Sequence, residues 1–513
     1  MKVKSVRLKN FRGYKNETTV ELNDLTAFVG KNDIGKSSIL EALDIFFNDS
    51  KGVIKLEKDD INKENLISGI NEIEIAVKFS ELPASLVIDS TNQTTLENEY
   101  LLNGSGDLEI IKRYPNAGKE KVFIKANHPT NPQCKDLLLK KDSELRTIIS
   151  TANIDCTDRT KNAVMRESIW NHYGDSLQLS EIEIDVTKGD TKSIWDKLQS
   201  YLPLYSLFQS DRKNSDGDSE VQDPLKEAVR QILSNDDLKE RFNAIANEVE
   251  SKLREVSNRT LEKIREMNPS IANSLNPIIP PSESLKWPDV FKNVSIAGDE
   301  DIPINKRGSG VKRLILLNFF RAEAERRKEE KNIPSIVYAI EEPETSQHTE
   351  HQKILIKSFL ALSQLPHTQI IITTHSGTVV KELDFEHLKL VTIENNIKQV
   401  STVLPGQLPY PSLNEVNFLA FTDVSEEYHN ELYGYIEAEG LLANYKAGKP
   451  TMPYQRIQRS GNVTTEQIIL TEYIRHQIHH PENTHNNRYT FEQLKDSVIQ
   501  MRNFISSQSL AGV

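Results

Sequence analysis

Alternating polar and apolar positions open the chain and predict β-strands. Residues 5–9 alternate in this way, and residues 18–22 form a second alternating run. Residues 25–29 are mostly apolar and stop at Gly30, which is typical of a short buried strand. Over residues 38–47 the period changes, because the apolar positions now repeat at the spacing of one helix face. The pattern therefore predicts strands followed by a strand–loop–helix unit.

Further along, the pattern changes three more times. Residues 71–125 return to the strand period and predict an antiparallel sheet, in which residues 108–114 pair with residues 121–125. From 135 to 275 the periodicity is helical and charged residues are dense. Strand–helix alternation resumes over residues 292–405, as in an α/β fold.

These changes divide the chain into four expected parts. An N-terminal lobe (1–134) and a C-terminal lobe (292–405) would form one α/β body. A helical insertion (135–291) would separate the lobes, and a helical, partner-binding tail (406–513) would follow them. A chain of 513 residues, 37% of them hydrophobic, is long enough for two or three domains with buried cores.

The composition argues against several classes of protein. The formal net charge of −12 argues against a protein that coats nucleic acid by bulk electrostatics. Cys134 and Cys156 are too few for a disulfide framework or a cysteine-rich zinc site, which suits a reducing compartment. The sequence shows no apolar signal core and no run that could span a bilayer. We therefore expect a cytoplasmic protein with no membrane partner.

A phosphate loop is predicted directly after the strand at 25–29. Gly30 and Gly35 bracket four residues, and Lys36 and Ser37 follow, which matches G-x-x-x-x-G-K-S. The glycines let backbone N–H groups approach phosphates, the lysine adds positive charge, and the serine offers a hydroxyl to Mg²⁺. A plain glycine turn is the alternative, but the preceding strand and the following helix favour the nucleotide site. The predicted ATP ligands are Gly30, Asn32, Gly35, Lys36, Ser37 and Ser38.

Carboxylates are predicted at the end of a second apolar strand, residues 335–340. Ligands of open α/β sheets bind at this carboxyl edge. Glu341 is placed to orient the Mg²⁺ shell, and Glu342 is placed to polarise the attacking water as a general base. An acidic pair that only solvates a strand end is the alternative. The phosphate loop upstream favours the catalytic interpretation.

A third apolar strand, residues 369–374, ends at His375. This histidine is placed to sense the γ-phosphate and to hold the attacking water. A lone histidine at a strand end is more often a structural hydrogen-bonding residue. Its position after the acidic strand favours the catalytic role.

Together with Lys9–Tyr14 (KNFRGY), these motifs resemble the ABC-type ATPases of the RecF, SMC and OLD group. In that group an nFRgy strand, a loop ending in GKSS, an EEPE-type strand and a TTHS strand occur in this order. The resemblance covers about residues 1–125 and 292–400. It implies an α/β fold with an ABC-type ATPase head, in which a mixed sheet with flanking helices is joined to an antiparallel β subdomain.

The resemblance also implies further site residues. Arg12 would lie near the nucleotide, and Gln209 would be the glutamine-loop residue and a Mg²⁺ ligand. Ser309 and Gly310 would form the signature loop, which departs here from LSGGQ and would cap the γ-phosphate of a second subunit. A homodimer with two ATP molecules between its subunits would follow. A simple helix N-cap at Ser309 is compatible with this interpretation. Glu341 stands where many relatives carry Asp.

The tail is similar to the PtuA ATPase subunits of Septu-type antiphage systems, including retron-associated ones, on the segments 423–435 and 473–483. OLD nucleases carry a Toprim domain with V-E-G and D-x-D motifs, and neither motif follows His375. The insertion is too short for a long SMC-type coiled coil. The resemblance thus implies a regulatory ATPase whose partner is an HNH nuclease of PtuB type, with a reverse transcriptase and its msDNA in the retron version.

Two other functions remain open. Arg475 and His480 match the R-x4-H pattern of HEPN ribonucleases, and His479, His480 and His485 could suggest a metal site. We favour an ordinary helix that begins at Thr464 or Thr465 and ends at Pro481. A RecF-type DNA-repair ATPase is the second alternative, and its candidate DNA contacts are Lys112, Arg113, Lys119, Lys121 and Lys125.

Overall fold

A computed structural model describes most of the chain outside its middle third. The described residues are 1–49, 52–87, 93–187, 191–209, most of 240–258, 335–345, 347–395, 397–457 and 461–511. Residues 1–210 and 324–513 form one compact unit, and residues 211–323 form a second. The expected signature loop with Ser309 and Gly310 lies outside the described residues. Of the described helices, none is both long enough and apolar enough to cross a bilayer.

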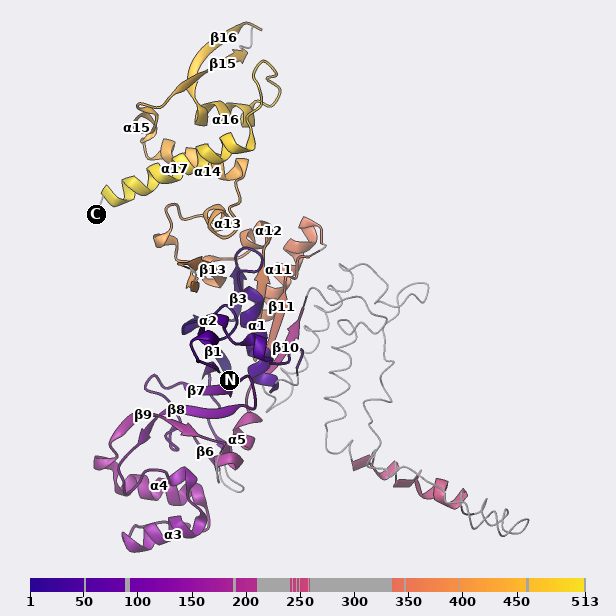
Figure 1. Cartoon of the computed structure of the whole chain (residues 1–513), viewed down its shortest axis with the longest axis vertical. Helices are drawn as coiled ribbons and strands as arrows, with labels where there is room; N and C mark the ends of the chain where they lie inside the picture. The colour runs from indigo at the N-terminus through magenta and orange to yellow at the C-terminus, as the bar shows by residue number, and fades with distance from the viewer. Residues whose placement is uncertain are drawn as a thin grey trace, which may run out of the picture. The chain divides into compact units, whose positions relative to one another are not determined.

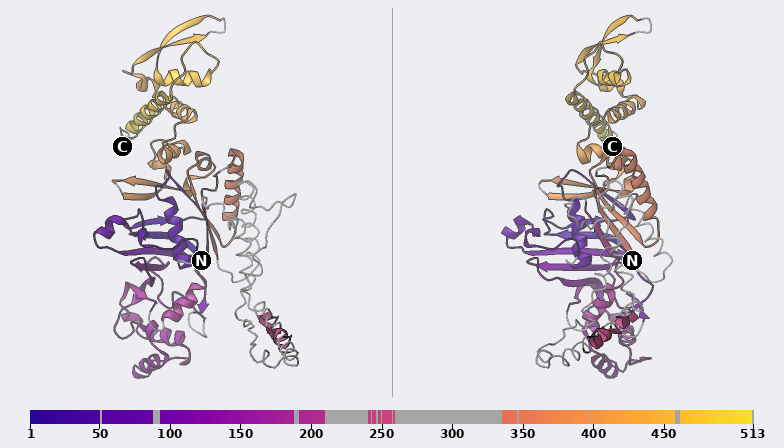
Figure 2. Two further views of the ribbon diagram at one scale, coloured as in Figure 1. Left: turned by 45° about the vertical axis from the view of Figure 1, so that its right-hand side comes forward. Right: turned by 90° about the vertical axis from the view of Figure 1, so that its right-hand side faces the viewer.

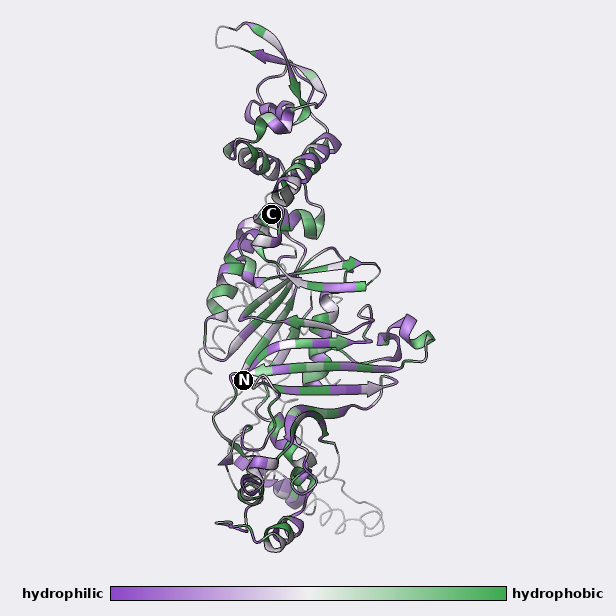
Figure 3. Ribbon diagram, turned by 90° about the vertical axis from the view of Figure 1, so that its left-hand side faces the viewer, coloured by the Kyte–Doolittle hydropathy of each residue, from purple (hydrophilic) through white to green (hydrophobic). Residues whose placement is uncertain are grey.

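The first sheet is antiparallel and has the strand order β2–β1–β4–β7–β8–β9 (Figure 1). Glu109 pairs with Lys125 across the β7–β8 hairpin, which confirms the expected pairing of these two runs. Apolar side chains of this sheet share a core with the helix α1 (Lys36–Asn48), as their alternation predicts. Figure 3 shows hydrophobic and hydrophilic positions side by side along the strands. The strands are β1 (Lys2–Lys9), β2 (Thr18–Glu21), β4 (Glu72–Ser80), β7 (Leu108–Pro115), β8 (Lys121–Pro129) and β9 (Leu179–Asp185), and two short strands, β5 (Leu86–Val87) and β6 (Gln93–Thr94), pair separately.

The second sheet has the order β10–β11–β12–β3–β13–β14 and is parallel except for its last pair. Every residue of β3 and β12 is buried, because helices cover the centre of this sheet and leave no polar face. The helix α1 packs against strands of both sheets (Figure 2). The strands are β3 (Leu25–Val29), β10 (Leu204–Phe208), β11 (Ile336–Glu341), β12 (Thr368–Thr374), β13 (Leu388–Glu394) and β14 (Ile397–Thr402), and the helices that accompany them are α1 (Lys36–Asn48), α11 (Thr349–Ser363) and α12 (Gly377–Lys381).

Part of the expected helical insertion belongs to the two sheets. β9 pairs with β8, and β10 pairs with β11, although both strands fall within residues 135–291. Apolar and polar residues alternate over part of Leu179–Asp185, as in a strand. This stretch is short and lies between charged helical segments, so the sequence analysis did not recognise it as a strand. The helices described between residues 60 and 200 are α2 (Lys63–Ile67), α3 (Asp142–Thr151), α4 (Asn162–His172) and α5 (Thr191–Gln199).

The tail is a small helical bundle that carries a β-hairpin, which the sequence analysis did not predict. Thr464 and Thr465 lie near the start of β16, so they do not cap a helix, and that expectation was wrong. Residues 463–469 are rich in β-branched side chains, which suit a strand. The helix starts at Leu470 and ends at His479, close to the expected stop at Pro481. The tail comprises α13 (Leu413–Phe421), α14 (Glu426–Ala438), α15 (Leu442–Lys446), β15 (Thr451–Ile457), β16 (Val463–Ile469), α16 (Leu470–His479) and α17 (Phe491–Ala511).

Candidate nucleotide-binding site

Four neighbouring parallel strands end at the same edge of the second sheet. Phe208 of β10 lies beside Ile340 of β11, and Thr374 of β12 lies beside Val29 of β3. Because the strands are in register, the residues that follow them meet at this edge. Those residues are Gln209, Glu342, His375 and the phosphate loop that begins at Gly30. The sheet thus brings together motifs that are far apart in the sequence.

The phosphate loop turns directly into the helix α1. Gly35 is the N-cap of this helix and has a φ of 112°, a left-handed conformation that favours glycine. No acidic side chain occupies the first turn of α1, so its positive end is available to an anion. Lys36 is buried, and its Nζ donates hydrogen bonds of 2.8 Å to the carbonyl oxygens of Gly30 and Lys31. Burial lowers the pKa of this lysine. Phosphate oxygens could take over these hydrogen bonds, so the loop fits a polyphosphate.

Glu342 is held in a strained conformation opposite His375. Its φ is 42°, which is uncommon for a residue with a side chain and is typical of functional sites. Its backbone N–H donates to the carbonyl oxygen of Thr373 at 3.0 Å. Its Oε1 lies 3.1 Å from Nδ1 of His375. The candidate base and the candidate switch histidine are therefore in direct contact.

Glu344 is a site residue to which the sequence analysis assigned no role. Its side chain is buried, and Oε1 accepts hydrogen bonds from Oγ1 of Thr374 at 2.7 Å and from the backbone N–H of His375 at 3.1 Å. Burial raises the pKa of this carboxyl group. The last carboxylate of the EEPE motif thus anchors the loop that carries the histidine. Its position two residues after Glu342 is the feature of the sequence from which its role could have been predicted.

Arg12 and Gln209 meet at one carboxylate, that of Glu41 on α1. The guanidinium group of Arg12 forms an ion pair with Glu41, and its Nε donates to Asp60 at 2.8 Å. Nε2 of Gln209 donates to Oε1 of Glu41 at 3.2 Å. Glu41 lies one helical turn after Ser37, so both expected residues lie beside the start of α1. The sequence analysis missed Glu41, although its spacing from Ser37 placed it on the same face.

The remaining predicted ligands surround the loop. Asn32 is exposed, whereas Ser37 and Ser38 are half-buried in the first turn of α1. Glu341 is the last residue of β11 and pairs with Thr373 in the sheet. Hydroxyl and carboxylate oxygens are the ligands that Mg²⁺ prefers, so Ser37 and Glu341 form a donor set that fits this ion.

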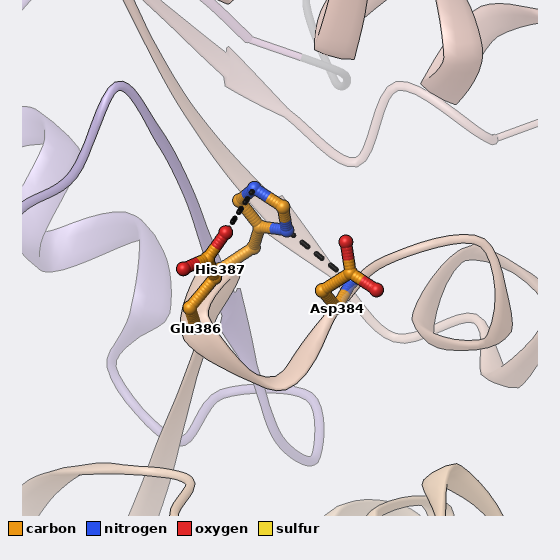
Figure 4. Close-up of side chains that lie close together, drawn as sticks. All are labelled: Asp384, Glu386 and His387. Atoms are coloured by element: carbon orange, nitrogen blue, oxygen red, sulfur yellow. Dashed lines mark hydrogen bonds and ion pairs between the residues drawn. The ribbon is translucent and has the colours of Figure 1, made fainter.

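A separate group of possible metal ligands is a capped turn. Asp384, Glu386 and His387 bring one ligand atom each within 4.8 Å of one another (Figure 4). Nδ1 of His387 already accepts the backbone N–H of Asp384 at 3.2 Å, and its Nε2 faces Glu386 at 3.8 Å. The histidine therefore closes its own turn, which accounts for the proximity of the three side chains.

The cations proposed as DNA contacts of the β7–β8 hairpin are largely neutralised. Lys112 is buried, and its Nζ donates to the carbonyl oxygen of Phe46 at 2.7 Å and contacts Asp49. Arg113 donates to Glu74 at 2.7 Å and to Glu183 at 2.6 Å. These two cations stabilise the fold and are not available to a nucleic acid backbone.

The two tail residues proposed as a ribonuclease pair have separate partners. The guanidinium carbon of Arg475 lies 4.0 Å from the ring centre of Tyr433, and its Nη2 lies 3.3 Å from Glu437. His480 lies beyond the last residue of α16, and its Nδ1 is 3.2 Å from Glu482. These contacts are those of an ordinary amphipathic helix end.

A phosphate loop between β3 and α1, with carboxylates at the neighbouring strand ends, defines a P-loop nucleotide-binding protein of the α/β class. The model of the AAA ATPase domain family, AAA_15, matches residues 1–380. The chain therefore belongs to this family of ATPase domains.

Two relatives and two solved structures are similar to this chain. An ATP/GTP phosphatase of Helicobacter pylori is 24% identical, over 81% of this chain and 99% of that protein. Endonuclease GajA of Bacillus cereus is 23% identical, over 78% of this chain, and the match spans 59% of GajA. An SMC head bound to the C-winged helix domain of ScpA has a TM-score of 0.35 at 15% identity, over 78% of this chain and 98% of that chain. The SMC head of Thermotoga maritima has a TM-score of 0.32 at 13% identity, over 79% of this chain and 100% of that chain.

Proposed function

We propose that this protein binds ATP with Mg²⁺ and hydrolyses it to ADP and phosphate. The contact between Glu342 and His375 at the edge next to the phosphate loop is the observation that carries this proposal. A carboxylate and an imidazole 3.1 Å apart beside a phosphate site are suited to activating water. The family and the similarity to an ATP/GTP phosphatase support the same reaction.

Each residue would have a distinct task. Lys36 and the N–H groups at the start of α1 would bind the phosphates, and Ser37 and Glu341 would hold Mg²⁺, which neutralises charge on the phosphates. Glu342 would accept a proton from the attacking water. His375 would stabilise the charge on Glu342 and contact the γ-phosphate, while Glu344 keeps the histidine backbone in place.

We propose further that the working unit is a homodimer. Ser309 and Gly310 of a second copy would cap the γ-phosphate, so each site would need both chains and ATP would hold them together. The full-length chain should then be a dimer with ATP when hydrolysis is blocked, and a monomer with ADP. Multi-angle light scattering measures both masses, and a monomer under both conditions would overturn the dimer proposal.

The biological role that we propose is regulation of a separate nuclease in antiviral defence. The sequence resemblance of the tail to PtuA subunits supports it, and so does the similarity to endonuclease GajA, of which the chain spans 59%. Residues 1–134 and 292–405 would form the ATPase lobes together with the strands β9 and β10 of the expected insertion (135–291), and residues 406–513 would be the surface that binds the partner. That partner would be an HNH nuclease of PtuB type, alone or with a reverse transcriptase and its msDNA.

Co-expression with the products of neighbouring genes tests this role. We expect an HNH protein to co-purify and its nuclease activity to respond to ATP. Degradation of nucleic acid by this chain alone, lost in Arg475→Ala, would instead favour the HEPN alternative. Tight and salt-sensitive duplex binding that is lost on removal of Lys119 and Lys121 would favour the repair alternative.

A further inference from the structure

A lysine from the far edge of the second sheet reaches the phosphate loop. Lys398 lies on β14, which pairs with β13, and β13 in turn lies beside β3. Its side chain passes close to two glycines, Gly13 and Gly35. A methyl group added at Gly13 would be 2.2 Å from Cε of Lys398, and one added at Gly35 would be 2.8 Å from its Nζ. Lys398 therefore occupies the space beside both the KNFRGY turn and the N-cap of α1.

The ammonium group of Lys398 has no anionic partner among the residues that the structure describes. It forms neither a hydrogen bond nor an ion pair with them, and its nearest ring is that of Tyr14, with the Nζ 5.9 Å from the centre. Asp33 and Arg12 are the nearby charged groups, and partial burial lowers the pKa of the lysine. On the same hairpin, the Nζ of Lys389 donates a hydrogen bond to Oγ1 of Thr402 at 2.8 Å. A half-buried cation beside a phosphate loop is suited to an anionic ligand.

We propose that Lys398 is a second cationic ligand of the nucleotide polyphosphate, in addition to Lys36. This inference rests on the proposed function and adds a residue to that site. The position of Lys398 also explains why residue 13 is glycine. The φ of Gly13 is not in the left-handed region, so glycine is needed here because the lysine side chain leaves no space for a Cβ atom. A side chain there would displace the lysine arm. The β13–β14 hairpin is thereby a part of the nucleotide site.

Calorimetric titration of the full-length chain with a non-hydrolysable ATP analogue and Mg²⁺ tests this proposal. Lys398→Met keeps the length of the arm and removes its charge, so it should weaken binding by about 10- to 100-fold, as expected for a lost charge-assisted contact. Lys398→Arg should retain most of the affinity. Lys389→Met removes a lysine from the same hairpin that does not reach the loop, and it should bind as the wild type does.

A double-mutant cycle at Gly13 and Lys398 tests whether the two residues act through the same contact. Gly13→Ala should weaken binding like Lys398→Ala does, and the double variant should bind no more weakly than Lys398→Ala alone. If Lys398→Met binds as tightly as the wild type while Lys36→Ala does not bind, the assignment of Lys398 is wrong and the proposed function stands. If the wild type binds no nucleotide, both proposals fail.

Discussion

Replacing Glu344 by alanine should damage both the fold and the reaction. The carboxylate is buried and accepts hydrogen bonds from the hydroxyl of Thr374 and from the backbone N–H of His375. Alanine would leave both donors without their acceptor. Each donor left unsatisfied costs about 1–3 kcal/mol, so the expected loss of unfolding free energy is about 2–6 kcal/mol. The His375 loop would also lose its anchor, so turnover should fall more than ATP affinity.

Two measurements separate these effects. Urea unfolding gives the loss of stability, and phosphate release at saturating ATP gives the loss of turnover. Glu344→Gln is the matched control, because an amide oxygen at the position of Oε1 can still accept both hydrogen bonds, so its loss of stability should be smaller. If Glu344→Ala is as stable and as active as the wild type, the anchoring role of this carboxylate is refuted.

Three further predictions concern other parts of the chain. Lys36→Ala should abolish nucleotide binding in a titration with ATP, because it removes the buried ammonium group whose hydrogen bonds the phosphate oxygens would take over. Burial lowers the pKa of His429 to about 4, so the tail should lose about 3 kcal/mol of stability as the pH falls from 6.5 through 4, and His429→Gln should remove this dependence in pH-resolved unfolding. Lys112→Met should destabilise the chain by about 1–3 kcal/mol, since it removes the charge-assisted contact with Asp49 and the hydrogen bond to the carbonyl oxygen of Phe46, and it should leave duplex binding unchanged in a salt titration.

The phosphate loop could be predicted from sequence because its signal is local. Gly30, Gly35, Lys36 and Ser37 lie within eight consecutive positions, and the flanking strand and helix have clear periods. The acidic strand and the strand before His375 each contain a continuous apolar run, residues 336–340 and 370–372, because central parallel strands are buried on both faces.

The remaining site residues depend on contacts across the sheet, which no local pattern encodes. Lys398 reaches Gly13 and Gly35 only because the β13–β14 hairpin lies beside β3. In the sequence, nothing distinguishes Glu41 from the other charged residues of α1. In the structure, Arg12 and Gln209 both contact its carboxylate.

The tail hairpin was missed for a different reason. Its strands are exposed along most of their length and so lack the alternation of a half-buried strand.

ATP hydrolysis by Glu342 is the central claim, and phosphate release by Glu342→Gln in comparison with the wild type tests it most directly. We expect the wild type to release phosphate, and the variant to bind ATP with similar affinity but to turn it over at least about 100-fold more slowly, because the general base is lost. Equal rates of phosphate release in the two proteins would contradict the account.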